Sequence, residues 1–410
     1  MLSTSSSPTG PNGCRAFSAA SGHFDTRTAA LEIAHAIHDA GGFRCDLMLF
    51  FCSYHHTAAV TEAIETIRGV LAPKHVLGCT SESVLGDDQE LDGIAGMSVL
   101  CLFMPGTRVS TFTGTPDAPI PISSIDRIPE YMDISDDTRG VLMFADPFST
   151  PITRLLPALN ELELPGGPIP ILGGMASGAS QPGHNRLILD DHVTNIGLVG
   201  LTISGDVELD FVISQGCRPI GDPMVVTGVE ENLITGLAGR PAKKVLEQAA
   251  ISIADEDQTL LKGGILVGSV LDEHKQRFGR GDFIVRNILG IPKDRPGFIV
   301  GEFPKLGQTI QFHVRDAKTA REDLQLLLDA QQLRTPPFGA LLVTCNGRGH
   351  RLFGTEAHDL SIVRQRLNQP PLAGLFAAGE LGPIGGRNLL HGHTAAITLF
   401  RERTADRTNG

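Results

Sequence analysis

The chain of 410 residues contains no tryptophan and only two tyrosines. Aromatic cages for cationic ligands and platforms that stack nucleic-acid bases both need such side chains, so the sequence supplies little for either. Basic residues are also in deficit, with 34 Lys and Arg against 46 Asp and Glu, for a formal net charge of −12. Nucleic acids and anionic membrane surfaces are bound by basic faces. We therefore expect no nucleic-acid partner.

Long apolar runs and paired cysteines are missing as well. No run approaches the ~18 apolar residues of a membrane-spanning helix, and the N-terminus lacks the charged and apolar segments of a secretion signal. Seven cysteines occur without a CxxC pair, which gives no sign of a zinc ribbon or a disulfide framework. The pair His35 and His38 has no third ligand in a recognisable motif. We expect a cytoplasmic protein with no membrane insertion and no metal site.

Strand–helix–strand segments recur three times along the chain. The first begins with the apolar run Leu47–Phe51, followed by a helix with an apolar stripe over Val60–Leu71. A similar strand–helix–strand pattern begins at Gly140, and another begins at Ala340. The strands lack alternation, so both of their faces should be covered. We predict an α/β fold with two lobes built from repeated strand–helix–strand units, in which mixed sheets face each other and helices lie outside.

Composition suggests where the domains begin and end. The Ser-, Gly- and Pro-rich residues 1–23 should be disordered. A first domain is expected over 24–220 and a second over 221–401, with a tail at 402–410. The alternating segment Asp222–Gly239 predicts a hairpin near the start of the second domain.

Glycine-punctuated turns near the C-terminus carry the first candidate site residues. Glycine concentrates where the backbone turns tightly or approaches another group closely. Arg348 follows the Asn346-Gly347 turn, and its guanidinium could bind a carboxylate or phosphate. Glu380 lies in the next such turn and could receive an ammonium group, with His391 shortly after it. In the alternative reading, Arg348 pairs with Glu380 or another acid, and Glu380 caps backbone N–H groups.

A second group of candidates lies earlier in the chain. Glu82 occupies a turn that we expect to correspond to the turn of Glu380, and Ser81 and Ser177 lie in related glycine-rich text. The Gly173–Ser180 segment lacks both the GxGxxG spacing and a P-loop ending, so no nucleotide cofactor is expected. If Arg348 and Glu380 prove to be scaffolding, the pocket should be sought at Ser81, Glu82 and Ser177.

Cys345 ends an apolar strand in front of the same Asn-Gly turn. A reactive cysteine needs a nearby base or cation, which a histidine such as His391 or His393 could supply. We expect instead that Cys345 is largely buried, without an ionised partner.

Several motifs resemble the FIST family of F-box and intracellular signal transduction proteins. HVLGCTSES is similar to its N-terminal domain, and ITGLAGRPAKKVLEQ, GDFIVRNILGI, CNGRG and GELGP follow the order of its C-terminal domain. The two domains expected above would then be the N- and C-terminal FIST domains. The resemblance implies a cytoplasmic small-molecule sensor, with amino acids as proposed ligands. F-box, kinase, cyclase and methyl-accepting domains are absent from the sequence, so a separate signalling partner would receive the output.

These observations give a leading function and two alternatives. We expect a sensory, signal-transducing protein whose ligand is an amino acid or small carboxylate, and which is not an enzyme. One alternative is a hydrolase or transferase using Cys345 or Glu380 with a histidine. The other is a protein–protein interaction module.

Overall fold

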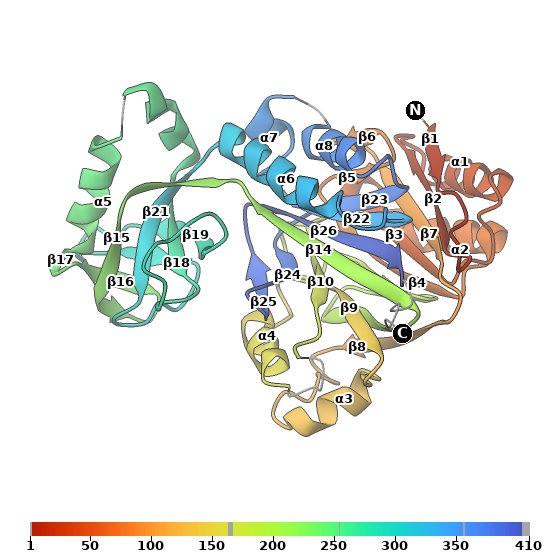
Figure 1. Ribbon diagram of the computed structural model, residues 1–410, viewed down its shortest axis with the longest axis horizontal. Coiled ribbons are helices and arrows are strands. Elements are labelled where there is room, and N and C mark those ends of the chain that lie inside the picture. The colour runs from red at the N-terminus through yellow and green to blue at the C-terminus, as the bar shows by residue number, and fades with distance from the viewer. Residues whose placement is uncertain (1, 163–166, 254, 356, 404–410) are drawn as a thin grey trace, which may run out of the picture. The chain divides into compact units, whose positions relative to one another are not determined.

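The three apolar runs each form the first strand of a parallel pair in the computed structural model, which describes residues 2–162, 167–253, 255–355 and 357–403 (Figure 1). The second strand of each pair follows after a helix, in register with the first. The α/β class predicted from these runs is confirmed. The predicted tail at 402–410 lies mostly outside the described residues.

The three segments are repeats of one topology. Each repeat runs opening strand, helical segment, first strand of the parallel pair, helix, second strand, hairpin and last strand. The opening strand pairs with the last strand and is called the edge strand below, although in repeat 1 a further strand, β1, pairs with its outer side. Repeat 1 consists of β2 (Arg15–Ser21), α1 (Thr26–Asp39), β3 (Leu47–Ser53), η1 (Tyr54–Ala59), α2 (Val60–Leu71), β4 (His75–Ser81), β5 (Val84–Gly86), β6 (Gln89–Leu91) and β7 (Met97–Phe103).

Repeat 2 has the same order with shorter helical segments before its first strand. Its elements are β8 (Thr107–Gly114), η2 (Ile125–Arg127), α3 (Ile128–Tyr131), β9 (Thr138–Ala145), α4 (Ile152–Asn160), β10 (Ile171–Met175), β11 (Leu187–Leu189), β12 (His192–Thr194) and β13 (Leu198–Gly205).

Repeat 3 is interrupted after its edge strand. Its elements are β14 (Val207–Gln215), α6 (Ala317–Gln331), β22 (Gly339–Cys345), α7 (His350–Phe353), α8 (His358–Arg366), β23 (Leu372–Ala377), β24 (Glu380–Ile384), β25 (Arg387–His391) and β26 (Thr394–Glu402).

The hairpins are exchanged among the repeats in a closed cycle. Hairpin β5–β6 of repeat 1 extends the sheet of repeat 3, where β5 pairs with β23 (Figure 1). Hairpin β11–β12 of repeat 2 extends the sheet of repeat 1 beside β4. Hairpin β24–β25 of repeat 3 extends the sheet of repeat 2 beside β10. Every sheet is therefore completed by another repeat.

The three sheets enclose a common core. Leu49 and Phe51 of the first sheet, Phe144 of the second, and Val343 and Leu375 of the third belong to one buried apolar cluster. The opposite faces of the first and second sheets pack against helices α1, α2 and α4. The sheets do face each other with helices outside, but there are three of them where two lobes were predicted. All three repeats can be recognised in the sequence, but the sequence does not reveal that each hairpin pairs with the sheet of another repeat.

One glycine recurs at the same register position of each second strand. Gly78 faces Phe50, and its counterparts are Gly173 and Gly374. A Cβ atom at each would lie only 1.8–2.1 Å from the carbonyl oxygen opposite, so the neighbouring strand leaves no room for a side chain. Equivalent residues of the three repeats can therefore be numbered from Gly78, Gly173 and Gly374.

The chain divides into two compact units. One unit contains residues 1–213, 325–390 and 394–410, and the other contains 214–324 and 391–393. Residues 325–390, expected in the second domain, thus group with the first two repeats.

The second unit is a barrel inserted between β14 and α6. Antiparallel pairing runs β15-β21-β18-β19-β20-β16, and β15 also pairs with β16, which closes the ring. The predicted hairpin at 222–239 is confirmed as β15–β16. The elements are β15 (Cys217–Glu230), β16 (Leu233–Leu237), β17 (Arg240–Pro241), α5 (Ala242–Ile251), η3 (Asp255–Gly263), β18 (Ile265–Val270), β19 (Phe283–Gly290), β20 (Phe298–Val300) and β21 (Thr309–Arg315).

The N-terminal segment differs from its prediction. Residues expected to be disordered form β1 (Leu2–Ser6) and β2, which pair antiparallel, and β2 also pairs with β7. Ala16, Ala19 and Ala20 of β2 are fully buried. The prediction was wrong because the Ser and Ala side chains of this segment give a weak hydrophobic signal in the sequence. Pairing with β7 orders the segment all the same.

Candidate functional site

The second strands of the three repeats end at equivalent positions. Four residues after the recurrent glycines stand Glu82, Ser177 and Ala378. Glu380 lies two positions further on, where repeat 1 has Val84. The predicted correspondence between Glu82 and Glu380 is therefore wrong by two residues. The counterparts of Glu82 are Ser177 in repeat 2 and Ala378 in repeat 3.

Backbone hydrogen bonds join these strand ends to one another. The N–H of Ser177 in repeat 2 donates to the carbonyl oxygen of Thr80 in repeat 1, at 3.4 Å. The N–H of Ala378 in repeat 3 donates to the carbonyl oxygen of Met175 in repeat 2, at 3.1 Å. Each link runs from the residue four positions after the glycine of one repeat to the residue two positions after the glycine of the repeat before it.

A hydroxyl group makes the third link. The N–H of Glu82 in repeat 1 donates to Ser177 Oγ over 2.9 Å, and that hydroxyl donates to the carbonyl oxygen of Phe376 in repeat 3. Ser177 thus touches both other repeats. Its proton is held by a carbonyl oxygen, so the hydroxyl is arranged as a structural bridge and not as an activated nucleophile.

A pocket of about 710 Å³ opens at this junction. All three repeats contribute to it, and the predicted residues Glu82, Ser177 and Asn346 come together there. The carboxyl ends of strands are the usual place for ligands in α/β sheets. The lining residues are Tyr54, Thr57, Glu82, Ser177, Gly178, Ala179, Ser180, Gln181, His184 and Asn346.

Two lining side chains have buried polar atoms without hydrogen-bond partners. Within the described part of the chain, neither Thr57 Oγ1 nor Asn346 Oδ1 has one. Buried polar groups are normally hydrogen-bonded, because an unmade bond costs about 1–3 kcal/mol. Both atoms belong to side chains that line the pocket.

An ion pair stands at the edge of the pocket. Arg351 of α7 pairs with the Glu82 carboxylate, and its second nitrogen donates to the carbonyl oxygen of Asn346 at 3.2 Å. The hydrogen bond to Glu82 raises the pKa of Arg351. The arginine side chain is 60% exposed, so water and solutes reach it. Sequence reasoning missed Arg351, although it lies only three residues after Arg348.

Arg348 has a different role from the predicted ligand contact. Its Nε and Nη2 atoms donate to both oxygens of Asp359, at 2.6 and 2.9 Å, and both side chains are buried. Burial by itself raises the pKa of Asp359, but the guanidinium outweighs that effect and holds the pKa well below its usual value. Thr344 also donates to Asp359. Arg348 ties its turn to α8, as the alternative of pairing with another acid predicted.

The remaining predicted residues also lie outside the pocket lining. Glu380 is fully buried and accepts hydrogen bonds from the N–H and hydroxyl of Thr394, at 3.2 and 2.6 Å. Ser81 is buried and donates to the carbonyl oxygen of Ser83. His391 is buried at the end of β25, and its contacts group it with the second unit. Of the seven predicted residues, the pocket brings together three.

Cys345 departs from its predicted environment. It is half-buried, whereas the other six cysteines are buried, and its sulfur accepts a weak hydrogen bond from the N–H of Gly347 at 3.5 Å. The thiol also interacts electrostatically with Arg348. Cys345 is thus largely buried, as predicted, but the prediction that it has no ionised partner is wrong, because the turn brings the guanidinium of Arg348 back towards the strand end.

The described residues contain no cluster of three or more His, Cys, Asp or Glu side chains placed to hold a metal ion. No helix among them combines the length and the apolar character needed to cross a membrane.

Proteins of similar sequence align with nearly the whole chain. Two uncharacterized proteins, one from Mycobacterium tuberculosis and one from Mycobacterium bovis, are 37% and 36% identical over 385 residues. Each alignment covers 92% of this chain, and 97% and 96% of the respective relative. A crystal structure of a cyanuric acid hydrolase from A. caulinodans aligns over 98% of this chain and 99% of its own, with a TM-score of 0.33 and 8% identity. That level of similarity supports no inference about fold or activity.

Domain families identify the chain more directly. Residues 46–240 match the FIST N domain and residues 242–383 match the FIST C domain. FIST domains are associated with sensing in signal transduction. Together these two matches account for most of the sequence, and the chain belongs to the FIST family.

Proposed function

We propose that this FIST protein is a cytoplasmic sensor that binds a small polar metabolite in the pocket at Ser177. The observation that carries the proposal is a pocket of metabolite size at the strand ends of all three repeats, with the guanidinium of Arg351 and the carboxylate of Glu82 at its edge.

The charges at the pocket favour a zwitterionic ligand such as an amino acid, or a small carboxylate. Arg351 offers a planar guanidinium for a carboxylate, and Glu82 offers a carboxylate for an ammonium group. These two side chains replace Arg348 and Glu380 in the scheme expected from the sequence. Since the Arg351 side chain is largely exposed, its pair with Glu82 contributes no more than about 1 kcal/mol, and a ligand can compete for both partners.

Enzymatic alternatives receive less support from the surroundings of the candidate nucleophiles. The Cys345 sulfur accepts a weak hydrogen bond from the N–H of Gly347, and Glu380 is buried against Thr394. A general base would have to reach the substrate within hydrogen-bond distance. We therefore propose binding without chemistry, with the signal passed to a separate partner protein.

A thermal-shift screen of the full chain against the twenty amino acids and small carboxylates tests the proposal. A ligand at one hundred times its dissociation constant should stabilise the fold by about 2.7 kcal/mol. Arg351→Gln should weaken binding of a hit by about 2 kcal/mol, as expected for loss of a charge-assisted hydrogen bond.

Arg295→Gln is the matched control, because Arg295 also forms an exposed pair with a glutamate, Glu230, in the barrel. It should bind the hit like the unmodified protein. A hit that binds equally well to both variants would place its site elsewhere. If no compound in the screen stabilises the protein, the amino-acid and carboxylate classes are wrong.

A further inference from the structure

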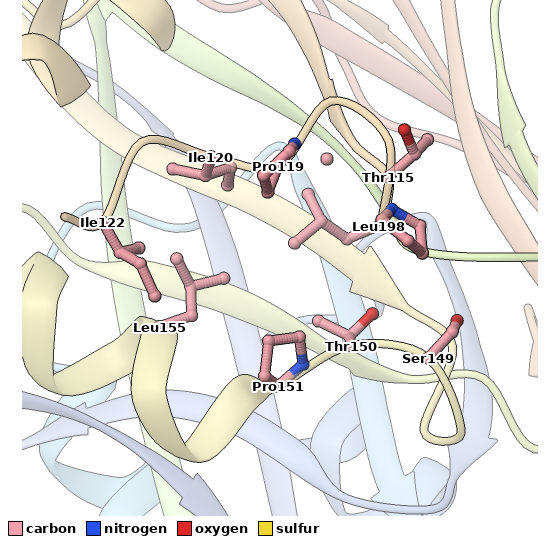
Figure 2. A pocket seen from close by; sticks show the side chains of 11 residues that line it. Thr115, Pro119, Ile120, Ile122, Ser149, Thr150, Pro151, Leu155 and Leu198 are labelled. Carbon is pink, nitrogen blue, oxygen red and sulfur yellow. The ribbon is translucent and has the colours of Figure 1, made fainter.

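A second cavity lies within repeat 2, between the loop after β8 and the beginning of α4 (Figure 2). Its volume is about 300 Å³, at the lower end of the range for small-molecule sites. Ile120, Ile122 and Leu155 point into it from two sides, and Pro151 borders it below (Figure 2). The full lining is Gly114, Thr115, Pro116, Pro119, Ile120, Ile122, Ser149, Thr150, Pro151, Leu155 and Leu198.

The hydroxyl groups at this cavity are already engaged within the protein. Ser149 Oγ donates to the Asp146 carboxylate at 2.6 Å and accepts from the N–H of Gly197 at 2.8 Å. Thr150 Oγ1 donates to the carbonyl oxygen of Gly197 at 2.8 Å. Thr115 Oγ1 accepts the N–H of Ala118. No lining side chain carries a charge, so the cavity offers mainly carbon atoms to an occupant.

The cavity lies where repeat 2 lacks a long helix that repeats 1 and 3 contain. Between its edge strand and first strand, repeat 1 has the 14-residue helix α1, which packs against α2 in one apolar cluster. Repeat 3 has the 15-residue helix α6 at that position in the order. Repeat 2 has only η2 and the four-residue α3 there. A proline-rich loop, residues 114–122, consequently lies over the start of α4 in place of a helix.

We propose that this cavity is a binding site for a small neutral apolar molecule, either an aliphatic chain or a single ring. The Ser149 and Thr150 hydroxyls are already engaged and no lining side chain is charged, so a strongly polar group entering the cavity would lose its water and gain few partners. Burial of apolar surface supplies the affinity. The site is separate from the polar pocket at Ser177 and does not depend on the function proposed for it.

Titration of the full-length protein with 1-octanol tests the proposal by isothermal calorimetry. We expect saturable binding to the unmodified protein. Ile122→Trp should fill the cavity and weaken binding by roughly tenfold or more, a loss of about 1.4 kcal/mol or more. Ile94→Trp is the matched control at a half-exposed isoleucine outside the lining, and it should bind as the unmodified protein does. Absence of saturable binding, or equal weakening in both variants, would overturn the site.

Two further binding experiments test the charge and the size of the molecule that the cavity accepts. Octanoate should bind more weakly than 1-octanol, because nothing in the lining pairs with its carboxylate, and tighter binding of octanoate would refute the neutral class. Leu155→Ala enlarges the cavity and serves if Ile122→Trp does not fold. It should improve binding of 1-decanol relative to 1-octanol, and an unchanged ratio would count against the site. Glu82→Gln should leave binding of 1-octanol unchanged.

Discussion

The N–H of Glu82 donates to the hydroxyl of Ser177, its own counterpart in the next repeat, over 2.9 Å. The other two links of the junction are direct backbone hydrogen bonds, at 3.4 and 3.1 Å. Among the three links of the described junction, this is the one in which a side-chain hydroxyl stands between two backbone groups. Ser177 also lines the polar pocket.

Ser177→Ala should remove this bridge. It leaves the Glu82 N–H and the Phe376 carbonyl oxygen without their partner, so the free energy of unfolding in urea should fall by about 1–3 kcal/mol. Ser180→Ala, at an exposed serine of the same pocket, should change it by less than about 0.5 kcal/mol. Equal effects of the two substitutions would show that the bridge adds no stability.

Asp359→Asn should be among the most damaging substitutions in the chain. It leaves the Arg348 guanidinium buried without its carboxylate, which costs about 3–5 kcal/mol. Asp329→Asn breaks an exposed pair with Arg366 and should cost less than about 1 kcal/mol. Denaturant unfolding of both variants provides the measurement, and a cost of Asp359→Asn as small as that of Asp329→Asn would contradict the scaffold role of Arg348.

Glu90 should make stability fall as the pH rises. Burial, with smaller effects from Asp359 and Asp92, raises the pKa of Glu90 from 4.5 to about 8. Between these values the folded protein keeps a proton that the unfolded chain releases, so raising the pH favours unfolding, by several kcal/mol across the window. Above about pH 8 both states are ionised, and this contribution stops changing.

Glu90→Gln stays neutral at every pH and provides the comparison. Relative to the unmodified protein, the variant should gain stability steadily from pH 5 to pH 8 in denaturant titrations. A difference between the two proteins that is independent of pH would show that Glu90 is ionised in the fold.

Gly374→Ala tests the close approach of the paired strands. A Cβ atom there would lie 2.0 Å from the carbonyl oxygen of Leu342, so the strands must separate at a cost of about 1–3 kcal/mol or more. Gly69→Ala makes the same change within α2, where nothing lies within 4 Å, and should stabilise the protein by up to about 1 kcal/mol. Thermal unfolding should move in opposite directions for the two variants.

Local pattern was enough to predict the α/β class and the three strand–helix–strand segments, because strands buried on both faces leave continuous apolar runs. It was not enough for contacts between distant segments. The partner of Arg348 lies on a helix that begins only after an intervening turn, and the partner of Glu82 belongs to another repeat. The N-terminal strands were missed because Ser and Ala carry little hydrophobic signal, even where pairing with β7 buries them. Glu82, Ser177 and Asn346 were found because glycine-rich turns at strand ends mark the junction.

Exchange of the hairpins has a consequence for how the chain can be divided. The boundary between the FIST N and FIST C domains, near residue 241, separates β15–β17 from the rest of their barrel. A cut there would also remove β24 from the edge of β10, and β5 from the edge of β23. Each fragment would expose bare strand edges, which invite aggregation. The two family domains thus share strand pairs across their boundary, and fragments should regain solubility only when produced together.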